Sequence, residues 1–300
     1  MALPPALSVK RLAELGEKLS RPLGIALSLV LLVVVLRQAY EADWSVLARS
    51  AGLSAAFWAV LLCYYFLSPC AEWLVYSRLW GFEPRAFPAL LRKLVCNELL
   101  LDYLGDVQFL AWARTHHAGA VAPFAAVKDV TVLSALTGNL VTVVLMALAW
   151  RHFSAGLPGL PLKAVLGSLA VIILGSSLVL LFGRRIFSHG PRMLVWIAGV
   201  LVLRTLGGLA LSAVLWHLLK PETSLSALFL LATGRMVVSR LPLVPSKELL
   251  FAGLAVLAFG RADAISVVTS MIATMVLLMH ISVGSVLALA HIVSAHRKRA

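Results

Sequence analysis

Charged residues are scarce in this 300-residue chain. Only 13% of its residues are charged, against about 25% in a typical soluble domain, while 61% are hydrophobic and the mean hydropathy is +0.96. No segment is long and polar enough to form a soluble catalytic domain. The composition therefore predicts an all-α polytopic membrane protein.

The chain also has few cysteines and lacks the common catalytic motifs. Cys63, Cys70 and Cys96 show no paired metal spacing and lie in apolar surroundings, which predicts structural thiols. The HExxH zinc motif, the GxSxG nucleophile elbow and the Gly-Lys-Ser/Thr of a phosphate loop are all missing from the sequence. We therefore expect no catalytic residue, no resident metal and no cofactor.

Basic residues outnumber acidic ones by 26 to 13, and they gather at the ends of apolar runs. This placement is typical of membrane orientation and of contact with anionic lipid, and it argues against a nucleic-acid surface. The positive-inside rule predicts that these clusters and both termini lie in the cytoplasm. The clusters lie before Pro22, at Arg78–Lys93, at Arg184–Arg192 and at the C-terminus.

Helix-length apolar runs predict about seven or eight membrane-inserted helices. Residues 1–21 read as a cytoplasmic amphipathic segment, 22–295 as a single membrane domain and 296–300 as a basic tail. Cytoplasmic termini require Arg92–His117 to enter and return on one side, while Leu249–Phe259 counts as a crossing. A return at the second segment would place the C-terminus outside.

The segment Arg92–His117 is too polar for an ordinary span. Glu98, Asp102 and Asp106 follow at i, i+4 and i+8, so one helix would carry all three on one face. Gly105 permits a break or a close backbone approach, and Arg114 is one of the nearby cations. Two interpretations remain: a helix at the membrane surface, or a re-entrant polar segment lining a cavity.

A second polar segment spans Arg235–Glu248. It is either a cytoplasmic loop or a pair of broken half-helices beside a wet cavity, because its prolines interrupt regular helix. The Glu-Leu-Leu at Glu98 occurs again at Glu248, 150 residues later, which suggests an inverted repeat. The segment contributes Arg235, Arg240, Pro242, Pro245, Lys247 and Glu248.

Arg204 lies about two turns inside a strong span. An arginine there costs about 2.5–3.5 kcal/mol on insertion scales, so we expect it to face a partner or water. Asp102, Asp106 and Asp129 are the first partners to test, and snorkelling from a tilted helix is the alternative.

The motifs LDYLGDV at 101–107 and LPLVPSKE at 241–248 resemble those of a known family. They are similar to the flippase-like membrane domain of lysylphosphatidylglycerol synthases and their stand-alone bacterial relatives. Those proteins have an early Gly-acid motif and a late Pro-x-x-Pro stretch leading to Glu. The resemblance covers roughly residues 20–295. It carries over to Gly105, Asp106, Pro242, Pro245 and Glu248.

Two details depart from the family pattern. Gln108 follows Val107 where the family usually has an arginine close to its Gly-acid motif, and Ser246 and Lys247 replace glycines. The soluble aminoacyl-transferring domain is missing from the sequence. The resemblance thus implies a protein that moves or binds a lipid and does not synthesise one.

The favoured function is translocation of a lipid, or assistance to it, through a polar groove that admits an anionic or zwitterionic headgroup. Arginine suits phosphate, and the acids would balance that charge or bind an amine. Alternatives are an enzyme acting on a lipid phosphate with Mg²⁺, or an accessory subunit of a glycolipid or lipid-export system. A homo-oligomer or a biosynthetic enzyme is the expected protein partner. The candidate substrate-binding residues are Glu98, Asp102, Gly105, Asp106, Arg114, Asp129, Arg204, Arg235, Arg240, Pro242, Pro245, Lys247 and Glu248.

Overall fold

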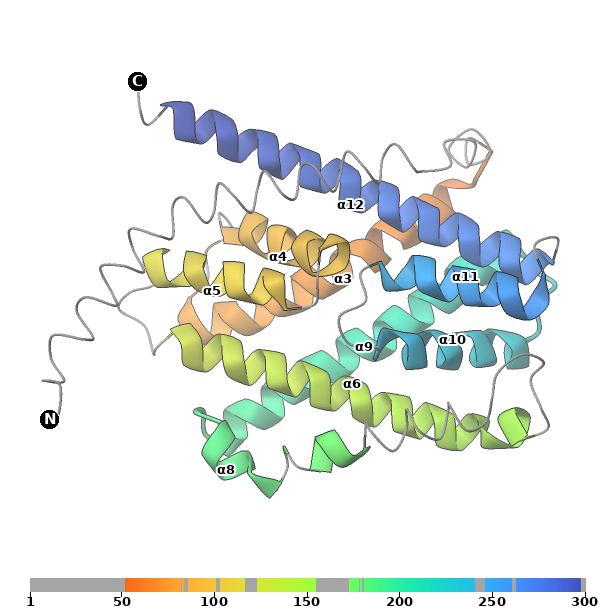
Figure 1. Cartoon of the computed structure of the whole chain (residues 1–300), viewed down its shortest axis with the longest axis horizontal. Coiled ribbons are helices and arrows are strands. Elements are labelled where there is room, and N and C mark those ends of the chain that lie inside the picture. The colour runs from red at the N-terminus through yellow and green to blue at the C-terminus, as the bar shows by residue number, and fades with distance from the viewer. Residues whose placement is uncertain are drawn as a thin grey trace, which may run out of the picture.

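The computed structural model describes residues 52–81, 83, 86–100, 103–116, 123–154, 173–177, 179, 181–240, 246–260 and 263–297. All regular structure in these ranges is α-helical (Figure 1). The N-terminal segment, the last three residues and the candidate residues Asp102, Pro242 and Pro245 lie outside them. The helices are α3 (Ala55–Trp80), α4 (Phe87–Leu99), α5 (Leu104–His116), α6 (Pro123–Ser154), α8 (Gly183–Ile186), α9 (Pro191–Leu219), α10 (Leu225–Ser239), α11 (Lys247–Phe259) and α12 (Ala264–Arg297).

Four of these helices, α3, α6, α9 and α12, are long and apolar enough to cross a membrane. Their ends follow local chemistry: Ser54 accepts a hydrogen bond from the Phe57 amide at the start of α3, and Gly81 ends it in a left-handed conformation. Large apolar side chains such as Val195 and Leu203 on α9 remain exposed, which suits a lipid surrounding. The chain is a multi-pass membrane protein.

The order long, short, short, long occurs twice, as α3–α4–α5–α6 and as α9–α10–α11–α12. In Figure 1, α3 and α9 cross side by side in opposite directions, and α6 and α12 also run in opposite directions on either side of them. Each pair of short helices forms a hairpin, and the two hairpins enter the bundle from opposite ends. Their tips meet in the middle, where the Ser246 amide donates a 2.7 Å hydrogen bond to the Glu98 carbonyl.

Each hairpin packs against the last long helix of the other unit. Val95 and Leu99 of α4 form a buried cluster with Leu277 and Ile281 of α12. On the other side, α10 contacts α6. This exchange of contacts binds the two units into one bundle, because neither hairpin is covered by its own unit alone.

The segment Arg92–His117 is divided between two helices, so the single-helix arrangement of the three acids does not apply. Helix α4 ends at Leu99 and α5 begins at Leu104, and Tyr103 between them has a positive φ of 70°. A non-glycine residue in the left-handed region marks a turn and not a helix interior. Glu98 and Asp106 therefore lie on two helices and do not share one face.

The segment Leu249–Phe259 belongs to the short helix α11, which pairs with α10. Helix α11 returns to the end of the bundle at which α10 begins: the hydroxyl of Ser266, in the first turn of α12, donates to the carbonyl of Ala255 near the end of α11. Helices α10 and α11 run in opposite directions, so the hairpin begins and ends at the same end of the bundle (Figure 1). Arg297 in the last turn of α12 consequently lies at the same end of the bundle as Trp80 and Pro191.

Two apolar clusters fill the bundle. One contains Ile197 and Leu201 of α9 with Phe109 of α5, and the other contains Leu209 and Trp216 of α9. Between them, α9 carries Arg204, so polar side chains occupy the middle of the long helices. That middle layer contains the candidate site.

Candidate functional site

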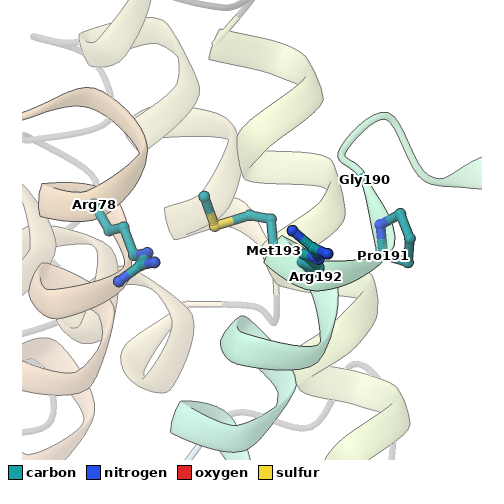
Figure 2. A pocket seen from close by; sticks show the side chains of 5 residues that line it. All are labelled: Arg78, Gly190, Pro191, Arg192 and Met193. Carbon is teal, nitrogen blue, oxygen red and sulfur yellow. The ribbon is translucent and has the colours of Figure 1, made fainter.

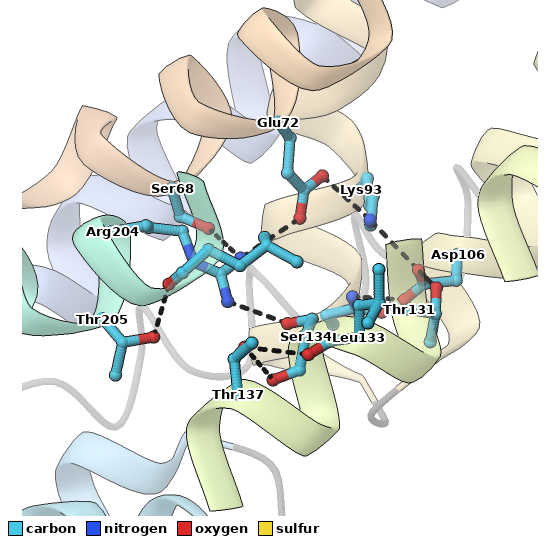
Figure 3. Close-up of polar contacts among 12 residues, drawn as sticks. Ser68, Glu72, Lys93, Asp106, Thr131, Leu133, Ser134, Thr137, Arg204 and Thr205 are labelled. Atoms are coloured by element: carbon cyan, nitrogen blue, oxygen red, sulfur yellow. Dashed lines mark hydrogen bonds and ion pairs between the residues drawn. The ribbon is translucent and has the colours of Figure 1, made fainter. Parts of the chain in front are cut away.

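Four charged side chains from four helices form the Glu72 cluster, which comprises Glu72 of α3, Lys93 of α4, Asp106 of α5 and Arg204 of α9 (Figure 3). Lys93 Nζ lies 2.8 Å from Glu72 Oε2 and 3.0 Å from Asp106 Oδ1. Arg204 Nη1 lies 3.6 Å from Glu72 Oε1. Two acids and two cations give the cluster a formal charge of zero, which makes its burial tolerable.

Neutral polar groups complete the hydrogen bonding of this cluster. Asp106 accepts hydrogen bonds from Thr131 Oγ1 at 2.7 Å and from Asn97 Nδ2 at 3.0 Å. Asn97 Oδ1 in turn accepts one from the Gly105 amide at 2.7 Å. Arg204 donates to Ser134 Oγ at 2.8 Å. Buried charges are stable only when such partners replace water, so the cluster is a built polar site.

The Glu248 cluster, comprising Tyr64 of α3, Arg235 of α10 and Glu248 of α11, lies at the second hairpin. Arg235 Nε donates to both carboxylate oxygens of Glu248, at 3.0 and 3.1 Å, and a second guanidinium nitrogen contacts Glu248 and the Tyr64 hydroxyl. Tyr64 donates to Glu248 Oε1 at 2.6 Å. The guanidinium also lies 5.3 Å from the Tyr64 ring centroid, within cation–π range. The Arg235–Glu248 pair is formally neutral, and the nearby acid Glu98 also acts electrostatically on Arg235 and Tyr64.

A buried tyrosine–histidine contact lies near the second cluster. Tyr65 Oη and His280 Nδ1 are 3.1 Å apart, which joins α3 to α12. This is the helix-to-helix hydrogen bond typical of polar residues inside membrane bundles.

Several predicted residues come together as expected. Asp106 and Arg204 belong to the Glu72 cluster, and Arg235 pairs with Glu248. Their neighbours shape the hairpins. Lys247 donates to the Ser239 carbonyl at 3.1 Å and closes the second hairpin, Glu98 contributes its carbonyl at the tips, and Gly105 faces the α4 backbone.

Gly105 is required by that close approach. A Cβ there would overlap the Lys93 carbonyl oxygen and lie 2.7 Å from Asn97 Oδ1. The sequence-based expectation of a close backbone approach at this glycine is therefore confirmed.

Three other predicted residues lie elsewhere. Arg114 is exposed in the last turn of α5, at the opposite end of that helix from Asp106. Arg240 packs its guanidinium against Gly138 of α6. Asp129 is fully buried, but it accepts hydrogen bonds at 2.9 Å from the Ser188 and His189 amides and so holds the segment before α9.

The proposed partner of Arg204 needs correction. The acid within ion-pair distance is Glu72, whereas Asp129 binds the 188–189 backbone. Asp106 is linked to Arg204 through Glu72 and Lys93. The physical reason is that α3 and α9 cross in the middle of the bundle, which brings an acid and an arginine on those two spans together.

Sequence reasoning left Glu72, Lys93 and Tyr64 out of the candidate site. Glu72 was detectable, because an acid inside an apolar span is as costly as Arg204 and is functional or paired by default. The signal for Lys93 is its spacing. Lys93 precedes Asp106 by 13 residues, and Arg235 precedes Glu248 by 13 residues.

The same spacing relates the two hairpins. Lys93 and Arg235 are 142 residues apart, as are Asp106 and Glu248. This shift also places α6 on α12 and matches Phe109 with Phe251. Under it Arg240 corresponds to Glu98, whereas the Glu-Leu-Leu match pairs Glu98 with Glu248.

A separate pocket of about 480 Å³ lies at the end of the bundle where α3 ends and α9 begins (Figure 2). Arg78 approaches from one side and Arg192 and Met193 from the other. Arg78 also stacks over the Trp196 ring at 4.7 Å. Exposed arginine beside an indole ring suits the headgroup layer of a membrane, so this pocket marks where the bundle leaves the apolar layer.

Neither cluster forms a metal site. Within the described ranges, no three His, Cys, Asp or Glu side chains gather closely enough to hold a metal ion. Comparison of the chain with protein-family models, with curated proteins and with solved structures found no match.

Proposed function

We propose that this chain translocates a membrane lipid, or assists its translocation, by guiding the polar headgroup through the middle of the bundle while the acyl chains stay in the bilayer. The observation that supports this most is the position of the two neutral charge clusters. The Glu72 cluster lies where α3 and α9 pack together, and Glu248 follows two residues after the Ser246 amide that joins the hairpin tips. Ionisable groups at such depth mark substrate or ion routes in membrane proteins.

The architecture supports transport over a purely structural role. We propose that the two four-helix units form an inverted repeat with re-entrant hairpins, an arrangement in which transporters bind substrate near the bilayer midplane. In this proposal the first hairpin enters from the cytoplasm and the second from the opposite side. Basic residues at the end of the bundle that carries Arg78, Arg114 and Arg192 set this orientation, and both termini are cytoplasmic.

The proposal also includes the family of this chain and the membrane in which it resides. Gly105 and Asp106 at the first tip, with Glu248 at the second, support membership of the flippase-like family, and such a protein resides in the bacterial inner membrane. The headgroup is the ligand, with Arg204 and Arg235 as contacts for phosphate. A biosynthetic enzyme or a second copy of the chain is the protein partner that this proposal admits.

The test is a leaflet-resolved assay on the purified chain. The protein is reconstituted in liposomes with fluorescent lipids, and dithionite quenching follows lipid exchange between leaflets with EDTA present throughout. We expect exchange above protein-free liposomes, and we expect Lys93→Gln/Asp106→Asn to abolish it. The matched control is Lys220→Gln/Glu222→Gln, which also removes one cation and one acid but lies in the link between α9 and α10.

The assay also separates the competing functions. Activity that requires Mg²⁺ and releases phosphate would show an enzyme acting on a lipid phosphate. No activity alone, together with a stable partner on purification from membranes, would show an accessory subunit.

A further inference from the structure

The two clusters occupy equivalent positions of the internal repeat. Each hairpin carries a cation on its first short helix and an acid near the start of its second, and the two form an ion pair across the hairpin. The 142-residue shift relates Lys93 to Arg235 and Asp106 to Glu248. The two hairpins that carry these pairs enter the bundle from opposite ends (Figure 1).

Neither pair is completely enclosed. The side chains of Arg235 and Glu248 keep 17% and 20% of their surface exposed, and those of Lys93 and Asp106 keep 6% and 13%. An ion pair that served only to join two helices could be replaced by apolar residues at little or no cost in stability. The residual exposure leaves each pair open to a polar group that comes from one side.

On the basis of the proposed function, we propose that the two clusters are two binding sites for the same headgroup, one reached from each side. We further propose that this headgroup is zwitterionic, with one phosphate and one ammonium group.

Charge balance points to a zwitterion. The ion pair of each hairpin is formally neutral, so a headgroup with net charge would add a charge that the pair does not balance, which is expensive in a medium of low polarity. A zwitterion instead places phosphate against the cation and ammonium against the carboxylate. Every charge in the cluster then keeps an opposite charge beside it.

Aromatic rings beside both cations favour an ammonium group further. The Tyr64 ring faces Arg235 at 5.3 Å, and Lys93 Nζ lies 5.7 Å from the Phe109 ring and 6.0 Å from the Tyr76 ring. Ring faces attract cations, and they do so more strongly once water is excluded. A headgroup ammonium would take the place of the protein cation beside the ring, while that cation moves toward the headgroup phosphate. The ring would then still face a positive charge.

The first experiment compares headgroups in the liposome assay. The probes are acyl-labelled phosphatidylethanolamine, phosphatidylglycerol and a cationic trimethylammonium diacyl lipid. We expect the zwitterionic lipid to move at least tenfold faster than the other two. Equal or faster movement of either charged lipid would overturn the zwitterion assignment while leaving lipid translocation in place. If none of the three moves faster than in protein-free liposomes, translocation itself fails and this inference fails with it.

The second experiment counts the sites. A phosphatidylethanolamine carrying a photoreactive diazirine in its acyl chain is cross-linked to the protein, and mass spectrometry maps the labelled peptides. We expect labels on both hairpins. In Arg235→Gln/Glu248→Gln, we expect labelling of α10–α11 to fall at least tenfold and labelling of α4–α5 to stay within twofold of wild type. Lys93→Gln/Asp106→Asn should show the reverse.

The retained label on the opposite hairpin shows that each variant is folded. The conservative variant Arg235→Lys/Glu248→Asp should restore labelling, and Lys220→Gln/Glu222→Gln should leave both labels unchanged. Loss of both labels from either hairpin variant, with the control intact, would mean a single shared site and would overturn the two-site proposal.

Discussion

Each hairpin has an ion pair between its two short helices, but the two pairs lie in different surroundings. In the first, Lys93 is a compact charge held between two carboxylates, and its side chain is only 6% exposed. In the second, the planar guanidinium of Arg235 engages one carboxylate through two nitrogens and is 17% exposed. Lysine suits a multi-acid cage and arginine suits a fork on one carboxylate. The ion pair of the first hairpin is therefore joined to charges on α3 and α9, whereas that of the second is joined to the Tyr64 hydroxyl on α3.

The largest expected effect comes from removing the shared cation of the first hairpin. Lys93→Met would leave Glu72 and Asp106 facing each other without the charge that joins them, and we expect a loss of about 3–5 kcal/mol of stability. Thermal unfolding in detergent measures it. Adding Glu72→Gln and Asp106→Asn should recover most of the loss, because no unpaired acid then remains. A Lys93→Met protein as stable as wild type would show that water or Arg204 already neutralises both acids.

The next largest effect on stability is expected at Gly105, where the first hairpin has a close backbone contact. Gly105→Ala would push a methyl group into the Lys93 carbonyl and Asn97, and such overpacking costs about 1–3 kcal/mol. Gly253→Ala in α11 is the matched control, because nothing lies within 4 Å of a Cβ there. Alanine should be neutral or slightly stabilising at that position, since it favours helix over glycine. Equal effects at the two glycines in thermal unfolding would contradict the tight packing of the first hairpin.

These differences show which parts of the structure can be read from the sequence. The long helices follow from their apolar length. The sequence predicts spans at 53–80, 123–150, 193–218 and 264–293, and the bounds of α3, α6, α9 and α12 lie within a few residues of these. The two polar segments were also detectable, because charges between apolar runs are costly. The break at Tyr103 was not, since Leu100 and Tyr103 carry no turn signal and only tertiary contact holds the left-handed conformation.

The partners of the candidate residues were the least predictable feature. Glu72 and Arg204 meet because α3 crosses α9, a choice that helix periodicity does not encode. The repeat was sought through a Glu-Leu-Leu match, and leucine is too frequent in this chain for that match to set the register. The correct shift is visible only when a cation and an acid are compared together, as Lys93 with Asp106 and Arg235 with Glu248.

A smaller effect on stability is expected from the ion pair between α3 and α9. A double-mutant cycle on Glu72→Gln and Arg204→Gln should give a coupling of about 1–2 kcal/mol in thermal stability, within the range for residues in direct contact. The same cycle between Arg204 and Asp106 should give less, because Glu72 and Lys93 lie between them. Asp129 and Arg204 should be additive. Coupling to Asp129 as large as that to Glu72 would contradict the observed arrangement.

The smallest expected effect concerns the second hairpin and its one hydroxyl partner. Tyr64→Phe removes the donor to Glu248 Oε1 but keeps the ring beside Arg235. The carboxylate still accepts two hydrogen bonds from Arg235 Nε and its neighbour, so no buried acceptor is left unsatisfied, and we expect a loss of only about 0.5–1 kcal/mol. Removing the ring as well, in Tyr64→Leu, should cost about 0.5–1 kcal/mol more, because the cation–π contact is lost. Thermal unfolding of both variants measures the two increments. If Tyr64→Phe lost as much stability as Lys93→Met, the Tyr64 hydroxyl and not the Arg235–Glu248 ion pair would be the main stabilising group of the second cluster. The two hairpins would then be stabilised by different interactions.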